Sequence, residues 1–349
     1  MICCWTALLS VGCGNLHVVS ISLPKDLQTL PQRARMGAVE SCPEGESMKK
    51  TLAILLLLSQ VVGCGSDAQK ALKENGNALA RLVDTAEVYR DDNGDIKGMN
   101  FYMDGKIRDA DLVHLKRLPK LTSLGFEKTK VGDAGLVHLQ EMTNLEVLNI
   151  ASTQVSNTGL VHLEGLAKLT SLNLAGTAVT DAGLVHLQAL TNLNRLTLAG
   201  TAVSDAGLVH LQGLTNLNDL GLYHTKVTDQ GMAHLKKLAN LESLVLGRTQ
   251  ITDAGLVHLQ ALTNLNDLTL TSTAVSDAGL IHLMKMTNLR GLYLQDTQVT
   301  DVGLLHLKEM PGLKRLWFST THVSRAAVAK LNQALPNCRI FHNNDGLSP

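Results

Sequence analysis

Histidine recurs at one fixed interval along most of this chain. The members of this column are His114, His138, His162, His186, His210, His234, His258, His282 and His306. Neutral imidazole is a common zinc ligand, so a ladder of metal sites is one chemical interpretation. However, packed helices lie about 8–10 Å apart and a zinc–nitrogen bond measures about 2.1 Å, so rings on adjacent helices cannot share an ion. We interpret the column as a packing or surface position and expect no metal or cofactor.

Threonine and aspartate columns share this period. The threonines are Thr129, Thr153, Thr177, Thr201, Thr225, Thr249, Thr273, Thr297 and Thr321. A buried hydroxyl at a turn can satisfy a backbone group, and we expect it to bond the backbone of the next repeat. Asp181 and its equivalents follow Ser or Thr, which places them at helix N-caps or in first turns. Each repeat has its own copy and no paired base, so we expect no catalytic residue here.

The element that positions these side chains is a 24-residue unit. Residues 181–208 and 253–280 are identical except at three positions, where Arg195, Ala199 and Gly200 become Asp267, Thr271 and Ser272. Within each unit, a Leu-x-x-Leu-x-Leu pattern predicts a short strand, and a following Gly-Leu-x-x-Leu-x-x-Leu pattern predicts a short helix.

The strand at residues 147–151 illustrates the expected orientation of the side chains. Leu148 and Ile150 face the core, while Val147, Asn149 and Ala151 face outward. A unit of this size cannot bury enough apolar surface to fold alone, so neighbouring units must stack. Strands stack about 4.8 Å apart, whereas helices need about 8–10 Å. We therefore predict an α/β fold: a curved solenoid with a parallel β-sheet on its concave face and short helices on its convex face.

The string Val-Thr-Asp-x-Gly-Leu-x-x-Leu at residues 179–187 resembles bacterial leucine-rich-repeat proteins and, more distantly, the cysteine-containing repeats of F-box proteins. The resemblance covers about residues 96–341. Thr replaces the cysteine of the F-box relatives and no F-box precedes the repeats, so their role as substrate receptors is not carried over. What the resemblance implies is a protein-binding scaffold.

Glycine forms one more column, and its breaks indicate where the array ends. Its members are Gly135, Gly159, Gly183, Gly207, Gly231, Gly255, Gly279 and Gly303. The terminal units carry Asp111 and Ala327 instead. Because a missing side chain is needed only where a neighbour packs closely, these two residues mark the ends.

The N-terminal segment suggests export. Lys49 and Lys50 precede the apolar run of residues 52–58, which is the order of a secretory signal peptide. The run is shorter than the ~20 residues of a spanning helix. Residues 61–64, Val-Val-Gly-Cys, resemble the lipobox of bacterial lipoproteins, which implies cleavage before Cys64 and lipid attachment to its sulfur. Because a signal peptide stands at the N-terminus, we expect translation to begin at Met48.

The expected organisation follows from these segments. It comprises an untranslated extension at 1–47, a signal peptide at 48–63, an anchor, spacer helix and N-terminal cap at 64–95, the solenoid at 96–323, and a C-terminal cap and tail at 324–349.

Composition and side-chain distribution point to a binding surface. Lys plus Arg and Asp plus Glu are equal at 31 each, so no overall field attracts nucleic acid. Aromatic residues make up 3% of the chain, yet several fall on the outward positions of the later strands. The predicted binding residues are Asp219, Tyr223, His224, Arg248, Asp267, Tyr293, Asp296 and Trp317. Tyr, Trp and Arg dominate the energetics of protein interfaces.

These observations favour a non-enzymatic scaffold, lipid-anchored in the bacterial envelope, that binds a protein or surface polymer through its concave face. One alternative is a cytoplasmic adaptor, if translation starts at Met1 and the apolar run is never exported. Another is an envelope enzyme with a concave-face site, although no nucleophile is paired with a base there. Cell fractionation and turnover assays separate the three.

Overall fold

The computed structural model describes residues 78–102, 107–319 and 322–342, and the chain divides into two compact units, Met1–Thr85 and Ala86–Pro349. The predicted extension, the signal peptide and Cys64 lie outside the described residues, as do Thr321 and the tail from residue 343. Residues 78–85 are helical, which is the described part of the expected spacer helix. In these described ranges, no helix has the length and apolarity needed to cross a membrane.

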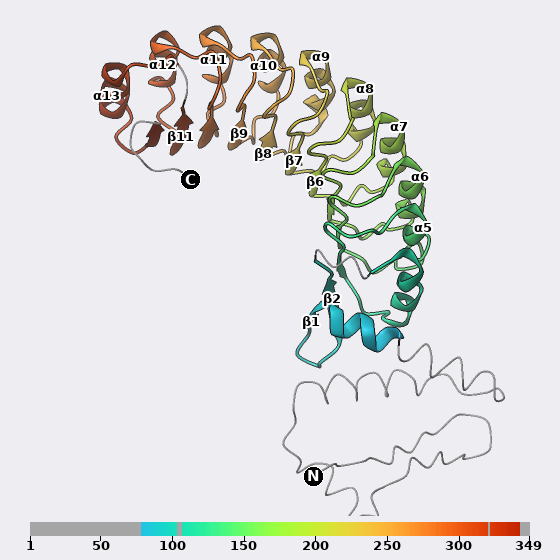
Figure 1. Ribbon diagram of the computed structural model, residues 1–349. Helices are drawn as coiled ribbons and strands as arrows, with labels where there is room; N and C mark the ends of the chain where they lie inside the picture. The colour runs from blue at the N-terminus through green and yellow to red at the C-terminus, as the bar shows by residue number, and fades with distance from the viewer. Residues whose placement is uncertain (1–77, 103–106, 320–321, 343–349) are drawn as a thin grey trace, which may run out of the picture. The chain divides into compact units, whose positions relative to one another are not determined.

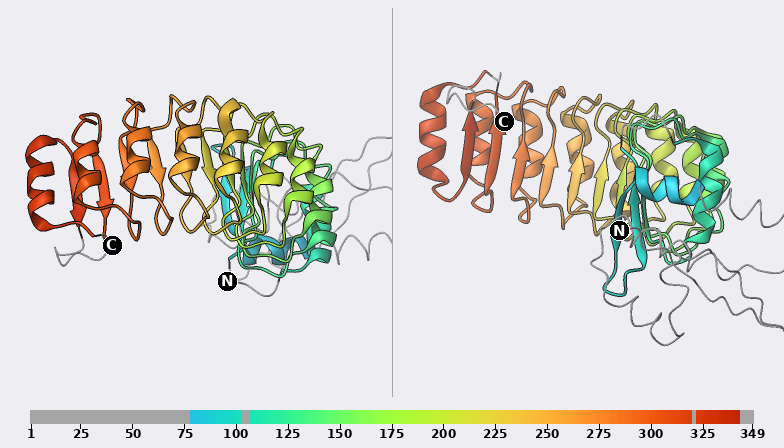
Figure 2. Two further views of the ribbon diagram at one scale, coloured as in Figure 1. Left: turned by 90° about the horizontal axis from the view of Figure 1, so that it is seen from above. Right: turned by 60° about the horizontal axis from the view of Figure 1, so that its bottom comes forward.

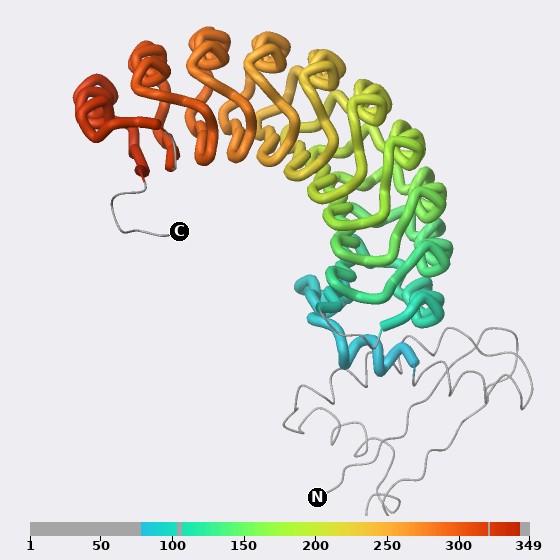
Figure 3. The backbone as a smooth tube through the Cα atoms, turned by 45° about the horizontal axis from the view of Figure 1, so that its top comes forward, coloured from blue at the N-terminus to red at the C-terminus, as the bar shows by residue number. Residues whose placement is uncertain are grey.

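The second unit is a one-dimensional stack of strand–turn–helix repeats. Within the described residues, twelve strands form one open sheet in chain order, and all pairs after the first are parallel. The sheet lines the inner side of the curve and the helices line the outer side (Figure 1). The backbone tube shows each repeat as one coil between the two layers (Figure 3). This is the curvature that the unequal spacing of strands and helices predicts.

The strands are short and lie side by side (Figure 2). They are β1 (Glu87–Arg90), β2 (Ile96–Asn100), β3 (Ser123–Gly125), β4 (Val147–Asn149), β5 (Ser171–Asn173), β6 (Arg195–Thr197), β7 (Asp219–Gly221), β8 (Ser243–Val245), β9 (Asp267–Thr269), β10 (Gly291–Tyr293), β11 (Arg315–Phe318) and β12 (Arg339–His342).

The outer layer mixes α-helical and 3-10 turns. The α-helices are α5 (Asp133–Leu136), α6 (Asn157–Leu160), α7 (Asp181–Leu184), α8 (Asp205–Leu208), α9 (Asp229–Met232), α10 (Asp253–Leu259), α11 (Asp277–Leu283), α12 (Asp301–Leu307) and α13 (Arg325–Ala334). The 3-10 helices are η1 (Asp109–Arg117), η2 (Val161–Leu163), η3 (Val185–Leu187), η4 (Val209–Leu211) and η5 (Ala233–Lys237).

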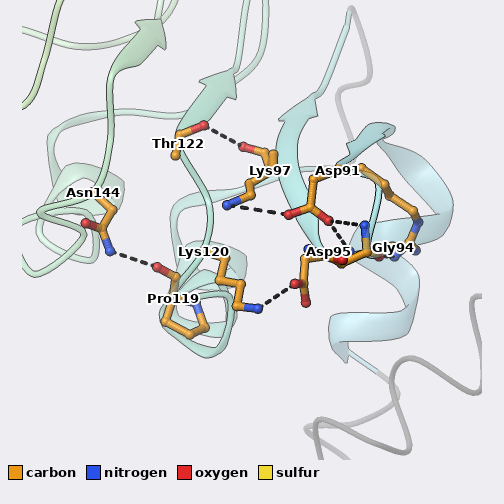
Figure 4. A network of polar contacts seen from close by, with 10 residues as sticks. Asp91, Gly94, Asp95, Lys97, Pro119, Lys120, Thr122 and Asn144 are labelled. Atoms are coloured by element: carbon orange, nitrogen blue, oxygen red, sulfur yellow. Dashed lines mark hydrogen bonds and ion pairs between the residues drawn. The ribbon is translucent and has the colours of Figure 1, made fainter.

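A β-hairpin closes the N-terminal end of the sheet. β1 and β2 pair antiparallel around a turn in which Gly94 has a φ of +81°, a conformation that favours glycine. Asp91 forms a salt bridge with Lys97 at 3.6 Å, and Asp95 forms one with Lys120 in the first repeat (Figure 4). The hairpin is thus bonded to the repeat that it covers.

The first repeat is one residue longer than the others. Gly98 on β2 pairs with Ser123 on β3, and Ser123 in turn pairs with Val147 on β4. The distance along the sequence from Gly98 to Ser123 is one residue longer than that from Ser123 to Val147. The chain between β2 and β3 therefore contains one residue more than the chain between β3 and β4.

The core consists of the periodic leucines and their substitutes. Leu148 is 1% exposed and Ile150 is fully buried, as predicted for the inward positions. The prediction for Ala151 was wrong, because this side chain is only 5% exposed. It follows the end of β4, where the chain turns away from the sheet, so strand alternation no longer applies.

The threonine column is buried as expected, but its hydrogen bonds differ from the prediction. The Thr153 hydroxyl donates to the Ile150 carbonyl at 2.7 Å, three residues earlier in the same repeat. Its equivalents bond in the same way, as at Thr201 and Leu198. The hydroxyl therefore closes a turn within its own repeat and does not bond the next one.

The bond between repeats is made by the aspartate column instead. Oδ1 of Asp181 accepts the Ser204 N–H at 2.7 Å, and Oδ2 accepts the Ser204 hydroxyl at 2.6 Å. We call this set the aspartate ladder. Its backbone bonds, all 2.6–2.8 Å long, join Asp109–Gly132, Asp133–Ser156, Asn157–Thr180, Asp181–Ser204, Asp205–Thr228, Asp229–Thr252, Asp253–Ser276, Asp277–Thr300 and Asp301–Ser324.

The aspartate ladder also explains the glycine column. A Cβ added to Gly207 would lie 2.4 Å from Oδ1 of Asp181 and 2.9 Å from Cδ1 of Leu184. Glycine is required because the carboxylate of the preceding repeat occupies the space of a side chain.

At the C-terminal cap the column holds Ala327. The N-cap of this helix, Ser324, has φ −81° and ψ 152°, whereas the N-cap Ser276 of an earlier repeat has φ −121° and ψ −171°. The last helix starts with a different geometry.

An asparagine column forms a second bond between repeats. Asn192 Nδ2 donates to the Ala167 carbonyl at 2.8 Å, and Asn288 donates to the Thr263 carbonyl in the same way. The next position of the column is occupied by Gly312, which has no side-chain amide to donate this bond. There, Arg290 Nη1 donates to the Thr287 carbonyl at 2.9 Å, so the equivalent acceptor is still satisfied.

We predict that Gly207→Ala destabilises the protein by about 1–3 kcal/mol, because the new methyl group must displace the Asp181 carboxylate. The matched control is Gly213→Ala, since a Cβ at Gly213 meets no atom within 4 Å. Chemical denaturation of both variants measures the difference. Equal stabilities would show that the ladder does not fix the spacing of the repeats.

We also predict acid sensitivity from the ladder. Burial raises the pKa of Asp133, but the hydroxyls of Ser156 and Thr158 and the N–H groups of Ser156 and Gly159 outweigh it and hold the pKa below its usual 3.8. A depressed folded-state pKa stabilises the fold above the unfolded pKa, and the contribution disappears as pH falls through both values. Asp133→Asn should therefore flatten the loss of melting temperature below about pH 5.

The natural Asn157 shows that an amide fits this position, with Oδ1 accepting the Thr180 N–H and Nδ2 donating to the Thr180 hydroxyl. Asp133→Ala, which leaves the Ser156 N–H unpaired, is the comparison and should cost about 1–3 kcal/mol at neutral pH. An Asp133→Asn variant with the acid profile of the parent protein would contradict the account.

Candidate functional site

The concave face is built from the residues on either side of the buried leucine in each strand. Parallel pairing in register aligns Gly291 with Arg315, and Tyr293 with Trp317. The next strand continues both columns with Arg339 and Phe341. Side chains that are one period apart in the sequence therefore lie next to one another on one surface.

The eight predicted residues fall into two structural classes. Asp219, Asp267, Tyr293 and Trp317 lie on strands β7, β9, β10 and β11. Tyr223, His224, Arg248 and Asp296 lie in the turns that follow β7, β8 and β10. The structure therefore spreads them over one surface and its edge and does not gather them into a single pocket.

The turn residues share an unusual backbone conformation. His224, Arg248 and Asp296 have φ of 54°, 54° and 55°, whereas the equivalent positions in earlier repeats include Gly176 and Gly200. Non-glycine residues rarely adopt this left-handed conformation. The same position holds Lys128 and Ser152 in the first repeats and glycine in the next two, so its side chain varies along the array while the backbone conformation is kept.

Two small groups form in the middle of the array. Arg248 lies over the Tyr223 ring at 5.8 Å, and His224 contacts the same ring edge-on at 6.3 Å. Asp219 is bound by Arg195 Nε at 3.2 Å across neighbouring strands. Asp219 is therefore already partnered within the surface.

The C-terminal end carries an aromatic stack that the sequence analysis identified only in part. The Tyr293 and Trp317 rings are stacked at 6.3 Å, and Trp317 and Phe341 at 3.8 Å. Arg339 lies over the Phe341 ring at 4.6 Å. Phe341 and Arg339 were missed because their strand was interpreted only as a cap. The period itself could have found Phe341, since it follows Trp317 at the same interval at which Trp317 follows Tyr293.

An ion pair spans two repeats beside this stack. Arg315 Nη2 donates to both carboxylate oxygens of Asp267, at 2.9 and 3.0 Å. Gly291 lies between them, and a Cβ there would clash with Asp267 Oδ1. Glycine at this strand position therefore makes the pair possible. Gly291 is a third residue of this region, after Phe341 and Arg339, to which the sequence analysis assigned no role.

The N-terminal half of the concave face carries smaller, polar side chains at the positions equivalent to Tyr293 and Trp317. On β4, Asn149 accepts the Ala151 N–H and contacts Glu127 at 3.3 Å. Thr197 on β6 is the equivalent residue two strands later. These residues provide matched positions for comparison with the aromatic end.

The histidine column lies on the outer layer, away from this surface. His186 Nδ1 contacts Glu164 at 2.6 Å, and His210 Nδ1 contacts Gln188 Nε2 at 2.7 Å, each in the preceding repeat. This is the arrangement of surface residues that bridge neighbouring helices. In the ranges that the structure describes, no three His, Cys, Asp or Glu side chains come together as a metal site.

Comparison with known proteins identifies the repeat. A family model described as "Leucine Rich repeat" matches residues 141–163, 165–187 and 237–259. The fold is a leucine-rich-repeat solenoid. No curated protein matches the chain.

Three solved structures illustrate the range of similarity. The internalin inlF of Listeria monocytogenes shares 23% identity, covering 68% of this chain and 77% of its own, at a TM-score of 0.43. Internalin C2 of the same organism shares 27%, covering 58% and 83%, at 0.47. The ectodomain of the Arabidopsis receptor kinase HAESA shares 16%, covering 72% of this chain and 46% of its own, at 0.53. The HAESA similarity supports the fold alone.

Proposed function

We propose that the protein is a non-enzymatic binding scaffold, and that the C-terminal half of its concave face binds a protein or a surface polymer. The open, curved sheet supports this proposal, since it displays aligned side chains from many strands on one surface. Binding sites of leucine-rich-repeat solenoids benefit from such an extended concave surface.

The observation that carries the proposal is the stack of Tyr293, Trp317 and Phe341. Aromatic residues are 3% of the chain, yet three of them meet here on adjacent strands. Rigid, partly buried aromatic side chains lose little conformational entropy on binding and dominate interface energetics. The HAESA ectodomain structure is a complex with a peptide hormone ligand, so a solenoid of this kind can hold a peptide.

The location proposed for the scaffold rests on the sequence. A positive segment, an apolar segment and Val-Val-Gly-Cys at 61–64 support export and lipid attachment at Cys64. A single acyl chain binds membranes weakly, so stable anchoring needs more than one. We therefore place the scaffold outside the cytoplasm, anchored to a membrane of the bacterial envelope.

We expect Tyr293→Ala and Trp317→Ala each to weaken partner binding by about 2 kcal/mol or more, because each removes an aromatic contact from the proposed site. The measurement is capture of a partner from envelope extract by the parent protein, followed by titration of the purified partner against each variant. Asn149→Ala and Thr197→Ala are the controls and should leave affinity unchanged. Equal losses at both ends of the array, or none at Tyr293 and Trp317, would refute the placement.

The anchor is tested separately. Cys64→Ala should move the protein from the membrane fraction to the soluble fraction, because the thiol that would carry lipid is missing. Fractionation of cells that produce either form measures this. A variant that stays in the membrane fraction to the same extent would show that Cys64 carries no anchor.

A further inference from the structure

Positive charge accompanies the aromatic stack at the C-terminal end of the concave face. Arg315 and Arg339 lie on β11 and β12, and Lys314 directly precedes β11. The acidic residue on the neighbouring strands is Asp267, which Arg315 already pairs. Among the described residues, no carboxylate is within ion-pair distance of Arg339, so this guanidinium keeps an uncompensated positive charge beside the stack.

These arginines retain hydrogen-bond donors for a ligand. Within the part of the chain that the structure describes, Arg315 uses only Nη2 toward Asp267, which leaves its Nε and Nη1 donors available. Arg315 is half exposed. A guanidinium with a free edge is well suited to bind a carboxylate through two hydrogen bonds.

The three rings of the stack are each partly exposed. Tyr293 lies against one side of Trp317 and Phe341 against the other, at centroid distances of 6.3 and 3.8 Å. The edge of an aromatic ring carries partial positive charge, whereas its face is negative. Ring edges beside guanidinium groups form a surface that favours anions and adjoining apolar groups.

From these contacts we propose that this end of the concave face binds an acidic segment of a partner protein. Carboxylates of the segment pair with Arg315 and Arg339, and an apolar or aromatic side chain packs against the edges of the Tyr293–Trp317–Phe341 stack. The inference rests on the proposed function and names the chemistry of the partner.

The geometry favours a peptide over a sugar polymer. Recognition of a sugar ring by stacking needs an exposed aromatic face, and both faces of Trp317 are covered by Tyr293 and Phe341. A peptide supplies carboxylates and apolar side chains at alternating positions of one extended chain, which matches the adjoining arginine and aromatic columns.

Tryptophan fluorescence reads this site directly. The sequence contains Trp5 and Trp317 as its two tryptophans, so a full-length Trp5→Phe protein reports on Trp317 alone. The probe is a random copolymer of glutamate and tyrosine, excited where tyrosine does not absorb, with polylysine as the charge-reversed comparison. We expect a saturable change in Trp317 emission with the acidic copolymer, weakening as salt rises, and none with polylysine.

Two variants in this background test the residues. Arg339→Gln should weaken binding of the copolymer about fivefold, as expected for loss of one charged contact. The control is Arg195→Gln, an arginine on the same concave face at β6 that is paired with Asp219. It should bind as the parent does, and circular dichroism confirms that each variant is folded.

An equal response to polylysine, a salt-independent response, or equal binding by Arg339→Gln would overturn the inference. No response to the acidic copolymer would also overturn it. A different result would refute the proposed function, namely a captured partner whose binding is unchanged by Tyr293→Ala and by Trp317→Ala. A captured partner that needs Trp317 but not Arg339 would leave the scaffold in place and reject the acidic segment.

Discussion

The interaction on which the structure depends is the aspartate ladder. In most steps, a carboxylate in the first turn of one helix accepts the backbone N–H and hydroxyl at the start of the next, as Asp181 does for Ser204. These groups lie in partly buried surroundings, where an unpaired N–H is costly. Because glycine must stand where the carboxylate passes, ladder and glycine column fix one distance between repeats. The hydrophobic core can then stack without a change of register.

This fixed register aligns the outward side chains of the concave face. Outward side chains separated by one period become neighbours, which is how Tyr293, Trp317 and Phe341 come to stack. The scaffold is the same at both ends of the array, since the core positions and the ladder repeat throughout. The polar surface around Asn149 and the aromatic surface around Trp317 therefore differ in their outward side chains and not in the core or the ladder.

The sequence was sufficient to predict the solenoid, its curvature and the buried leucines, because these follow from periodicity. It did not reveal the ladder, since a bond from Asp181 to the backbone N–H of Ser204 in the next repeat has no local signature. The left-handed turn at His224 and Arg248 was missed because glycine occupies it in only some repeats. The pair of Asp267 and Arg315 joins residues two periods apart and depends on the small Gly291 between them. The period places Phe341 beside Trp317, but it does not indicate which residues pair across two repeats.

Hydroxyl-radical footprinting of the complex with the captured partner tests the placement of the binding surface most directly. Oxidation of Tyr293, Trp317 and Phe341 is measured by mass spectrometry with and without the partner. Tyr89 and Tyr102, which are 47% and 52% exposed near the other end of the sheet, serve as internal references. Our account predicts strong protection of the three stacked residues and unchanged oxidation of the two references. Protection of the references or of the outer helices, with the stack still oxidised, would contradict it.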